Sequence, residues 1–375
     1  MVLVPAVAEL RLADVMTSCH SALLGEDNKL GLGPVTKAAV LLVDGLGASN
    51  LRNRQGHARW LMSAWGSQQP VLDSGFPSTT ASALASLTTG DWPGTHGIVG
   101  YTIRDPHSGQ LINHLKDWEP TVAPEVWQRS STVFERAQSE GIACLALGEH
   151  RFSGSDFTKA VWRGAQFQGT SGLAEQFHLM REFFDAHDKA LVYLYWPALD
   201  RTGHSGGVAS EAWTRRLEDF DQAVSSLEGS LSADEGLIIT ADHGMVDVSD
   251  DLKMMVGENS DLLRGVVAWG GEPRVPQLYI ESSDFLDPLV QSWKEAVGDS
   301  ALVMTREDVI SRGLLGDVAP EVSARVGDIV ILAASDVAFY RPAVASTQSM
   351  AMIGQHGSIT PEERAVPLIR LGAWG

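Results

Sequence analysis

The sequence predicts an α/β fold in which helices cover both faces of a mostly parallel central sheet. Short apolar runs alternate with longer stretches of helical periodicity, as expected for a series of βαβ units. The apolar runs are continuous rather than alternating, which is typical of strands buried on both faces. The chain has 375 residues, of which 44% are hydrophobic and 20% charged. That composition supplies enough apolar material for a large core.

Five apolar runs are the candidate strands. They are AAVLLVDG at 38–45, IACLALG at 142–148, ALVYLYWP at 190–197, GLIITADHG at 236–244 and DIVILAA at 328–334. Periodicity predicts helices at about 121–140, 172–187 and 209–229. The last two helices end shortly before a candidate strand, as a doubly wound fold requires.

The segment from about 251 to 350 is less regular than the rest of the chain. It contains a further strand, PQLYIE at 276–281, and a candidate helix near 284–297. No internal repeat, low-complexity tract or linker separates this segment from its surroundings. We therefore expect a single α/β domain over residues 1–375, with about 251–350 as a small inserted subdomain at its periphery.

The acidic balance of the chain limits the partners that it can bind. The formal net charge is −19, and Lys and Arg are scattered rather than clustered. A nucleic acid polymer needs a basic surface that releases counterions, so we do not expect that partner. A small phosphorylated substrate can still bind, because divalent metals supply positive charge inside an acidic protein.

Cysteine usage and the N-terminus indicate the expected location. Cys19 and Cys144 are too few and too far apart for a disulfide framework or a thiolate metal site. The N-terminal segment has no basic region, and Pro5, Glu9 and Arg11 interrupt its apolar residues. No run approaches the roughly 20 apolar residues of a membrane-spanning helix. We expect a cytoplasmic protein without a membrane partner, and the oligomeric state stays open.

The first motif with chemical potential is LLVDGLG at 41–47. A buried strand there delivers Asp44 into a glycine-flanked turn. Ligands of open α/β sheets bind at the carboxyl ends of the strands, where Asp44 is expected to lie. The alternative is an Asp that caps the following turn, which is the commoner role of Asp-Gly after a strand.

The second motif, GFPSTTASALASLTTG at 75–90, is a turn that runs into a helix of small residues. Ser78, Thr79 and Thr80 therefore lie at a helix N-terminus, where free N–H groups and the helix dipole favour an anion. We expect Ser78 or Thr79 to be the N-cap. A Thr hydroxyl is a poor nucleophile unless a base or a metal lowers its pKa, and no His or Lys adjoins Thr80 in the sequence.

The third motif is PALDRTGHSGG at 197–207. Its Asp200 and His204 are four residues apart, a spacing that brings them together on one helical turn or compact loop. Carboxylate and imidazole ligands at that spacing suit zinc. A surface Asp/His pair is the alternative, but the preceding apolar strand and the flanking glycines favour a site.

The fourth and fifth motifs supply further ligands. In LIITADHGMVD, Asp242 and His243 are adjacent at a strand end. Strand neighbours point in opposite directions, so joint ligation needs the turn at Gly244 to redirect them, and a buried core histidine is the alternative. In GQHGS, His356 lies between two glycines near the C-terminus. His96 in GTHGIVGY has similar surroundings and is interpreted as structural.

The five motifs together indicate a two-metal site. They supply seven candidate residues at strand ends or loops of one predicted sheet, namely Asp44, Thr80, Asp200, His204, Asp242, His243 and His356. Two tetrahedral metal sites fit this set. Ions roughly 4 Å apart stabilise the attacking and leaving oxygens of an in-line displacement. Thr80 is then the candidate nucleophile of a phosphoryl transfer.

At these residues the sequence resembles the alkaline phosphatase superfamily, and within it the nucleotide pyrophosphatase/phosphodiesterase (type I phosphodiesterase) family. VDGLG, PSTT followed by TTG and HGIV, RDP at 104–106, DRTGHSGG, TADHG and GQHG match in the family's order over most of the chain. Each motif is weak alone, but the ordered set is specific. The sulfatase branch is disfavoured, because no Cys/Ser-x-Pro-x-Arg signature occurs at the nucleophile position.

The resemblance implies a role for each ligand. It makes Thr80 the residue that is transiently nucleotidylated or phosphorylated. It assigns two divalent ions, most simply Zn²⁺, one held by Asp44, Thr80, Asp242 and His243 and the other by Asp200, His204 and His356. Manganese or iron could also occupy such sites.

Two positions depart from the family pattern as we read it. Ala83 stands where the resemblance implies an Asn that contacts a phosphoryl oxygen, and Ala81 stands where an aromatic residue often stacks on a nucleobase. The resemblance therefore implies phosphodiester chemistry more strongly than a nucleotide substrate. The substrate wall stays open, with Trp92 and Tyr101 as candidates and Trp118 and Trp127 as further aromatics.

These observations predict a two-metal hydrolase of phosphodiester or pyrophosphate bonds that acts through a covalent intermediate on Thr80. A phosphomonoesterase is the nearest alternative. Monoesterases usually neutralise an extra charge with an Arg or Lys near the nucleophile, and none lies within 75–90. A non-catalytic, metal-dependent binder of phosphorylated ligands is a further alternative, and transfer to an acceptor other than water stays open.

Overall fold

The computed structural model describes residues 4, 8–116, 118, 122–227 and 229–375. Its central sheet has six strands in the spatial order β18 (Ile369–Gly372), β8 (Glu235–Thr240), β1 (Lys37–Val43), β7 (Ala190–Trp196), β5 (Ala143–Glu149) and β6 (Gln166–Thr170). All neighbours pair in parallel except the edge strand β18, which is antiparallel to β8. The predicted α/β class with a mostly parallel sheet is confirmed.

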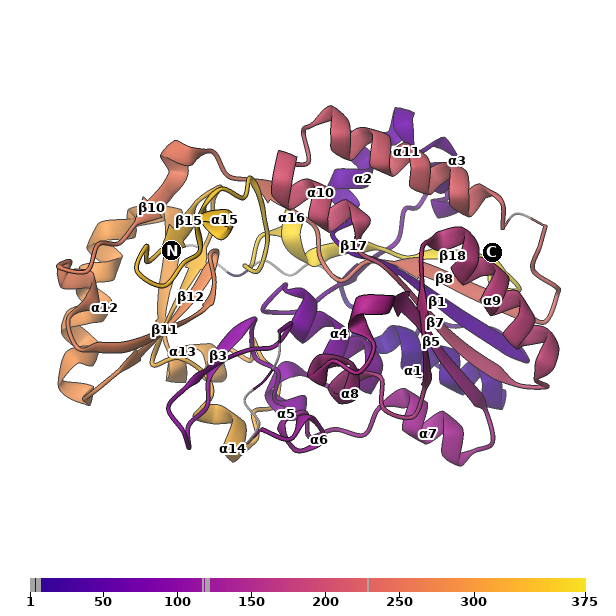
Figure 1. Ribbon diagram of the computed structural model, residues 1–375, viewed down its shortest axis with the longest axis horizontal. Helices are drawn as coiled ribbons and strands as arrows, with labels where there is room; N and C mark the ends of the chain where they lie inside the picture. The colour runs from indigo at the N-terminus through magenta and orange to yellow at the C-terminus, as the bar shows by residue number, and fades with distance from the viewer. Residues whose placement is uncertain (1–3, 5–7, 117, 119–121, 228) are drawn as a thin grey trace.

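Helices cover the central sheet on both sides (Figure 1). One side carries α1 (Ala13–Leu24), α4 (Thr80–Thr89) and α7 (Val133–Ser139), and the other carries α2 (Ala48–Asn53), α3 (Arg59–Trp65) and α11 (Glu211–Ser225). The inner strands are therefore buried along almost their whole length, with β1 and β8 reading as continuous apolar runs. The helices predicted near 172–187 and 209–229 are confirmed as α9 (Leu173–Ala186) and α11.

A second, antiparallel sheet lies beside the first (Figure 1). Its order is β11 (Val266–Glu272), β12 (Val275–Ile280), β14 (Ile329–Ala333) and β13 (Ala301–Thr305), and α12 (Leu286–Val297) packs on β13. A separate hydrophobic cluster of this sheet includes Trp293, Leu278 and Phe339. The strand predicted at 276–281 and the helix near 284–297 are both present, while the division of the chain into domains stays a prediction.

The assignment of the run 328–334 to the central sheet was wrong, because β14 pairs antiparallel with β12 and β13. The physical reason is that β14 is covered on both faces. Val330 and Leu332 belong to the large core, whereas Ile329, Ile331 and Ala333 belong to the smaller cluster. A strand between two cores gives the same continuous apolar run as a strand of a parallel sheet.

The single helix predicted at 121–140 was also wrong. Residues 119–121 lie outside the described part of the chain, and the rest forms two short helices, α6 (Pro124–Trp127) and α7. The side chain of Thr132 accepts the Glu135 N–H, and the Glu135 carboxylate accepts the Thr132 N–H. This capping box fixes a new helix start where the periodicity suggested continuation.

The remaining elements are short. The helices are α5 (Pro93–His96), α8 (Asp156–Val161), α10 (Ala198–Gly206), α13 (Arg306–Ser311), α14 (Pro320–Ser323), α15 (Thr347–Met350) and α16 (Pro361–Arg364). Two-stranded pairs join β2 (Val71–Asp73) to β17 (Ala365–Pro367), β3 (Thr102–Arg104) to β4 (Leu111–Asn113), β9 (Val246–Asp247) to β16 (Gly354–Gln355), and β10 (Lys253–Met255) to β15 (Ala338–Tyr340).

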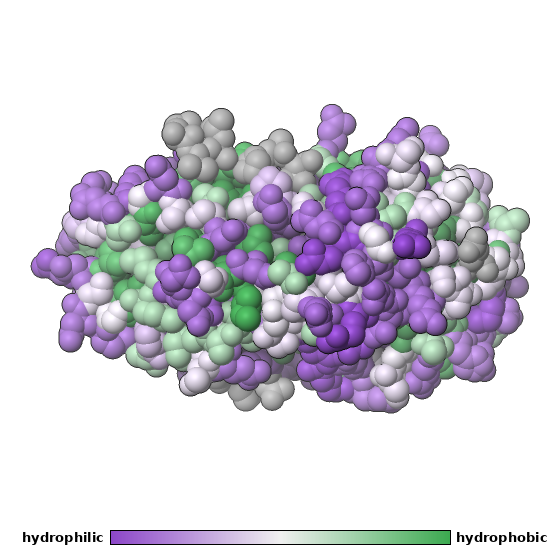
Figure 2. All heavy atoms as spheres, turned by 90° about the horizontal axis from the view of Figure 1, so that it is seen from above, coloured by the Kyte–Doolittle hydropathy of each residue, from purple (hydrophilic) through white to green (hydrophobic). Residues whose placement is uncertain are grey.

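The surface is not uniform in polarity. Seen from above, hydrophobic residues gather in the half of the molecule that contains the second sheet, and hydrophilic residues dominate the centre and the other half (Figure 2). Exposed apolar side chains of the segment around the second sheet include Met255, Val267 and Val344. Within the described residues, every helix is too short or too polar to cross a bilayer.

Candidate metal centre

Three adjacent strands of the central sheet deliver acidic side chains to one edge. Asp44 directly follows β1, Asp200 lies in the first turn of α10 after β7, and Asp242 follows β8. The peptide N–H of Asp200 donates to the carbonyl oxygen of Asp44 at 3.1 Å, so α10 begins in contact with the end of β1. These strands are neighbours in the order β8-β1-β7, which brings their carboxyl ends to one place.

Asp242 and His243 both reach the site although they are adjacent in sequence. β8 ends at Thr240, so neither residue has to follow the alternation of a strand. Asp242 Oδ2 lies 3.5 Å from His243 Nε2, and Asp242 Oδ1 accepts the N–H groups of Gly45 and His243. A side chain at Gly244 would meet the Glu362 carbonyl oxygen at 2.1 Å, so glycine is required at this turn.

Thr80 is the first residue of α4, and its side chain faces the same cluster. The Thr80 hydroxyl lies 3.1 Å from His243 Nε2. The expected side-chain cap is absent: Thr79 occupies the N-cap position without a capping hydrogen bond, and the Ser78 hydroxyl donates to the carbonyl oxygen of Ser358. That bond ties the start of α4 to the C-terminal segment, which leaves the helix N-terminus open to another acceptor.

A second cluster is formed by α10 and the loop after β16. Asp200 Oδ1 lies 3.2 Å from His204 Nε2 and 3.7 Å from His356 Nε2. A Cβ at Gly354 would lie 2.5 Å from the Gly203 carbonyl oxygen, so only glycine allows the loop to approach α10 this closely. Asp200 also belongs to the first cluster, and the two overlapping groups of possible donors are Asp200, His204, His356 and Asp44, Asp200, His243.

The three histidines of the site share one arrangement. Each places Nδ1 on a backbone carbonyl oxygen: His204 on Gly354 at 2.8 Å, His356 on Ser78 at 3.0 Å and His243 on Gly244 at 3.2 Å. Donation from Nδ1–H fixes the tautomer with a lone pair on Nε2. All three Nε2 atoms therefore face the carboxylates as potential metal ligands.

Burial keeps these groups from carrying charge without a counterion. Burial raises the pKa of Asp44 well above its ordinary value, and the nearby carboxylates of Asp242 and Asp200 raise it further. Burial also raises the pKa of Asp242, and it lowers the pKa of His356, with further lowering from His243 and His204. Bound cations would reverse these costs by pairing with the carboxylates.

The hydrogen bonding of the three carboxylates shows that the residues fit a divalent metal. One oxygen of each of the three carboxylates, Asp44 Oδ1, Asp200 Oδ1 and Asp242 Oδ2, is buried and accepts no hydrogen bond. Buried polar atoms are normally satisfied, so orphaned oxygens beside available imidazole nitrogens point to an ion. Carboxylate oxygen and imidazole nitrogen are donors that zinc and its neighbours in the first transition series accept.

Two residues near the site were missed in the sequence. The Tyr195 hydroxyl, on β7, donates a hydrogen bond to Asp44 Oδ2. Glu272, at the end of β11, is buried, accepts the Tyr101 N–H at 3.1 Å and packs against Gly357, next to His356. Burial raises the pKa of Glu272 to about 8. Tyr195 lies in an apolar run, so the sequence gives no reason to distinguish it from an ordinary core residue. Glu272 could have been found, because Glu272 and Arg274 are two charged residues at the junction of two apolar strands.

The aromatic candidates for a substrate wall mostly lie elsewhere. Trp92 packs against Gly316 and stacks under Arg11, 4.2 Å from the guanidinium carbon to the ring centre. Trp118 and Trp127 are buried and donate their indole N–H groups to His114. Tyr101 is half-buried, and its peptide N–H donates to Glu272 near the site.

Three residues singled out in the motifs have packing roles. The methyl groups of Ala81 and Ala83 belong to the hydrophobic core. His96 is buried, accepts the Ile98 N–H on Nδ1 and lies 3.0 Å from the Ser86 hydroxyl through Nε2. Burial lowers the pKa of His96 to about 3, as suits a neutral structural histidine.

Comparison with curated proteins finds relatives of one kind. An uncharacterised pyrophosphatase/phosphodiesterase of Schizosaccharomyces pombe is 26% identical over 194 residues, which cover 48% of this chain and 39% of the relative. Ectonucleotide pyrophosphatase/phosphodiesterase 1 of Saccharomyces cerevisiae is 26% identical over 231 residues, 51% of this chain and 30% of the relative. The chain thus spans less than half the length of these relatives.

Solved structures share the fold. Murine ectonucleotide pyrophosphatase/phosphodiesterase 5, as an inactive variant in complex with AMP, matches with a TM-score of 0.69 and 18% identity, over 90% of this chain and 88% of that one. Phosphonoacetate hydrolase of Sinorhizobium meliloti 1021, in complex with phosphonoformate, matches with a TM-score of 0.67 and 17% identity, over 90% of both chains.

A model of one protein family covers almost the whole of the region that builds the site. It matches residues 38–359, which include every one of the seven candidate residues from Asp44 to His356. This match includes all five motifs and the whole of the second sheet. The chain belongs to the type I phosphodiesterase / nucleotide pyrophosphatase family.

Proposed function

We propose that this protein is a two-metal hydrolase of phosphodiester or pyrophosphate bonds, with Thr80 as its nucleophile. The observation that carries the proposal is the shared orientation of His204, His243 and His356. Each is fixed through Nδ1 on a carbonyl oxygen and presents Nε2 to a carboxylate oxygen that lacks a hydrogen bond. The Thr80 hydroxyl lies at the same cluster, 3.1 Å from one of these nitrogens.

The residues of the site have separate roles in the proposed reaction. Two divalent ions, when bound, would lower the pKa of the Thr80 hydroxyl and stabilise the charge on the leaving oxygen. Asp44, Asp242 and His243 would hold one ion beside Thr80, and Asp200, His204 and His356 would hold the other. Zinc is the expected metal for this donor set, although manganese or iron could occupy it.

Thr80 is placed for covalent catalysis. Its oxygen would form a bond to phosphorus while the bond from phosphorus to the leaving oxygen breaks, and water would then cleave the phospho-threonine ester. The N-terminal turn of α4 begins at Thr80, so its free N–H groups and dipole would bind the phosphoryl oxygens. Tyr195 would hold Asp44 in position through its hydrogen bond.

The substrate is proposed to be a small diester or pyrophosphate. Absence of Arg and Lys from residues 75–90 favours a diester over a monoester, which carries one more charge. A fold neighbour in complex with AMP supports a nucleotide as one such substrate. The phosphonoacetate hydrolase neighbour adds a carbon–phosphorus bond as a second possibility to test. The proposed location stays the cytoplasm.

Hydrolysis of three compounds tests this proposal. Bis-p-nitrophenyl phosphate, p-nitrophenyl phosphate and phosphonoacetate should be compared with zinc and then manganese in the buffer. We expect the diester to have the highest kcat/KM. A strong preference for the monoester would replace the proposal by a phosphomonoesterase.

Substitution of the nucleophile tests its role. Thr80→Ala should reduce kcat at least about 10³-fold while metal content is unchanged, because the covalent route is lost. Thr79→Ala is the matched control, since its hydroxyl makes no capping bond, and it should keep most activity. If the wild-type protein turns over no ester and both variants bind ligands equally well, the protein is a binder rather than an enzyme.

A further inference from the structure

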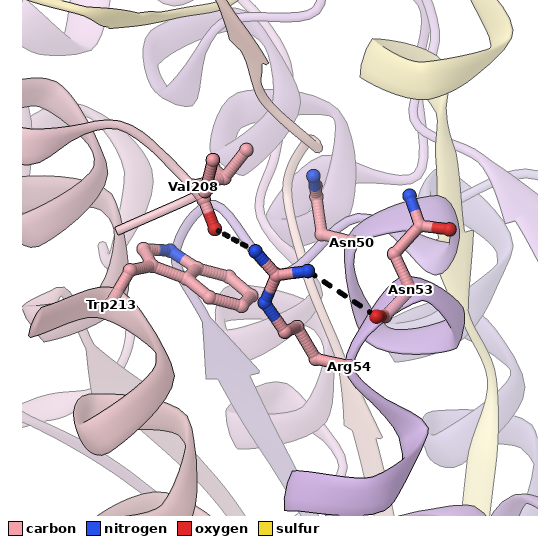
Figure 3. Close-up of a pocket in the computed structure, with 6 residues that line it drawn as sticks. Asn50, Asn53, Arg54, Val208 and Trp213 are labelled. Atoms are coloured by element: carbon pink, nitrogen blue, oxygen red, sulfur yellow. Dashed lines mark hydrogen bonds between the residues drawn. The ribbon is translucent and has the colours of Figure 1, made fainter. Parts of the chain in front are cut away.

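A pocket of about 160 Å³ lies apart from the metal centre, between α2, α11 and the loop that follows α10 (Figure 3). Its lining consists of Asn50, Asn53, Arg54, Val208, Ala209 and Trp213. An engineered cavity of about 150 Å³ is large enough to hold benzene, so this volume can accept a small ligand. None of the residues of the pocket belongs to the candidate metal centre.

Arg54 is the charged side chain of this pocket, and it is poorly satisfied. Its three hydrogen bonds go to neutral oxygens at long distances: Nε to Thr214 Oγ1 at 3.3 Å, Nη1 to Asn53 O at 3.4 Å and Nη2 to Val208 O at 3.4 Å. Across the described residues, no carboxylate comes within ion-pairing distance of this guanidinium. A half-buried guanidinium normally pairs with a carboxylate or phosphate through two parallel bonds.

Trp213 forms a buried wall of the pocket. Its indole and the Arg54 guanidinium line the same pocket (Figure 3). The Trp213 side chain is fully buried and its Nε1 has no hydrogen-bond partner. The indole is therefore a reporter of what the pocket holds, and Arg54 is the donor that a ligand reaches.

The rest of the lining favours a ligand that accepts hydrogen bonds. No acidic side chain lines it, and the Asn50 amide is already bonded to both the N–H and the carbonyl oxygen of Met245. The nearest carboxylate to the loop, Asp247, accepts the N–H groups of Val208 and Ala209 at 2.7 and 3.0 Å. Its oxygens are thus turned to the backbone of that loop.

We propose that this pocket binds a small oxyanion, a carboxylate or phosphate group, which pairs with Arg54. An oxyanion supplies both the negative charge and the acceptor oxygens that this guanidinium lacks. The overall charge of −19 opposes unspecific anion binding, so binding here depends on Arg54. Asn53 is an exposed residue of the same lining.

The pocket is connected to the metal centre by packing. Trp213 Cδ1 lies 3.5 Å from the position that a Cβ of Gly203 would occupy, on the helix that holds Asp200 and His204. Asn50 brackets the backbone of Met245, two residues after His243. The anion would therefore contact side chains that pack behind both metal-bearing segments.

The experiment follows the indole signals of the full-length, zinc-loaded protein by ¹H–¹⁵N NMR. The resonance lost in Trp213→Phe identifies Trp213. Inorganic phosphate and sodium acetate are then titrated in separate arms at constant ionic strength. We expect a saturable shift of this resonance at millimolar anion; a response to phosphate alone assigns a phosphate site, and a response to acetate alone assigns a carboxylate site.

Variants separate this site from anion bound at the metals. Arg54→Gln should weaken the response at least about tenfold. Arg52→Gln, at the end of α2 two residues before Arg54 but bonded to Gln69 outside the pocket, should leave the response unchanged. If Arg54→Gln does not fold, Asn53→Asp, which places a like charge at the mouth, should weaken binding instead. The absence of a saturable shift with either anion overturns the proposal. A shift in the Arg54 or Asn53 variant that equals the shift in the wild-type protein overturns it as well.

Discussion

Tyr195 and Tyr193 form a comparison pair at the residue scale, because only the Tyr195 hydroxyl makes a hydrogen bond. Both lie on β7, two residues apart, and both are buried. The Tyr195 hydroxyl donates to Asp44, whereas the Tyr193 hydroxyl has no partner. Hydrogen bonds to a metal-binding carboxylate orient it and typically contribute 10–100-fold to affinity.

Tyr195→Phe should therefore weaken zinc binding about 10–100-fold, and Tyr193→Phe should leave it nearly unchanged. Competition with a chromophoric chelator measures both affinities. Equal zinc affinity in Tyr195→Phe and the wild-type protein would show that the hydrogen bond has no part in holding Asp44.

Glu272 is the residue with a pH-dependent effect on stability. Burial raises its pKa to about 8 from an ordinary value of 4.5, so the folded state holds the proton more tightly than the unfolded state. The folded protein should lose stability from this group as the pH rises from about 4.5 to about 8, because folding then has to bury a charge.

Glu272→Gln removes the titration and keeps an acceptor for the Tyr101 N–H. Its free energy of unfolding relative to the wild-type protein should rise with pH, by about 4 kcal/mol between pH 5 and pH 9. Urea titrations at several pH values measure this difference. Glu281→Gln, at an exposed position nearby, should show a flat difference; a flat difference for Glu272→Gln as well would contradict the prediction.

At the scale of elements, one ion pair joins the β11–β12 hairpin to α16. Arg274 and Glu363 are both fully buried and make two parallel bonds of 2.7 and 2.9 Å. Glu363 also accepts the N–H of Ser358, two residues after His356. The pair thus anchors the loop that carries His356 to the second sheet.

Arg274→Met should destabilise the protein by about 3–5 kcal/mol, because Glu363 is left as a buried, uncompensated charge. Arg341→Met is the surface control, since it breaks an exposed pair with Glu258 and should cost less than about 1 kcal/mol. Denaturant unfolding of the two variants gives the comparison. Similar losses in both would mean that burial does not set the value of these pairs.

The same elements show which parts of the fold and of the candidate site could be predicted from the sequence. Three apolar runs, each followed by Asp44, Asp200 or Asp242, were correctly predicted as strands. Because ligands bind at the carboxyl ends of the strands in such sheets, these three residues were expected to lie together. β14 was misplaced because an apolar run does not reveal whether its two covering layers are helices or separate cores. Tyr195 was missed because periodicity cannot distinguish a hydroxyl that meets a carboxylate from one that meets nothing.

At the scale of the whole molecule, the orphaned carboxylate oxygens link metal binding to stability. Chelation should lower the melting temperature by several degrees and zinc should restore it, because a ligand that binds only the folded state stabilises it by mass action. Differential scanning fluorimetry with and without chelator measures the shift. In Asp200→Ala, which removes a donor common to both groups, the zinc-dependent shift should largely disappear.

An unchanged melting temperature of the wild-type protein after complete chelation would contradict this link. Magnesium is the control ion, because it prefers octahedral oxygen ligands over imidazole and should restore little. A full recovery with magnesium would argue against the mixed carboxylate and imidazole donor set proposed here.

The position of β14 has a consequence for how the molecule comes apart. Its alternate side chains belong to two different hydrophobic clusters, so neither cluster can open without exposing one face of the same strand. Local opening of the second sheet alone would have to break this shared strand from the main core. The backbone amides of β14 should therefore exchange with solvent deuterium only by global unfolding, and a chain built around two sheets should melt in one cooperative step.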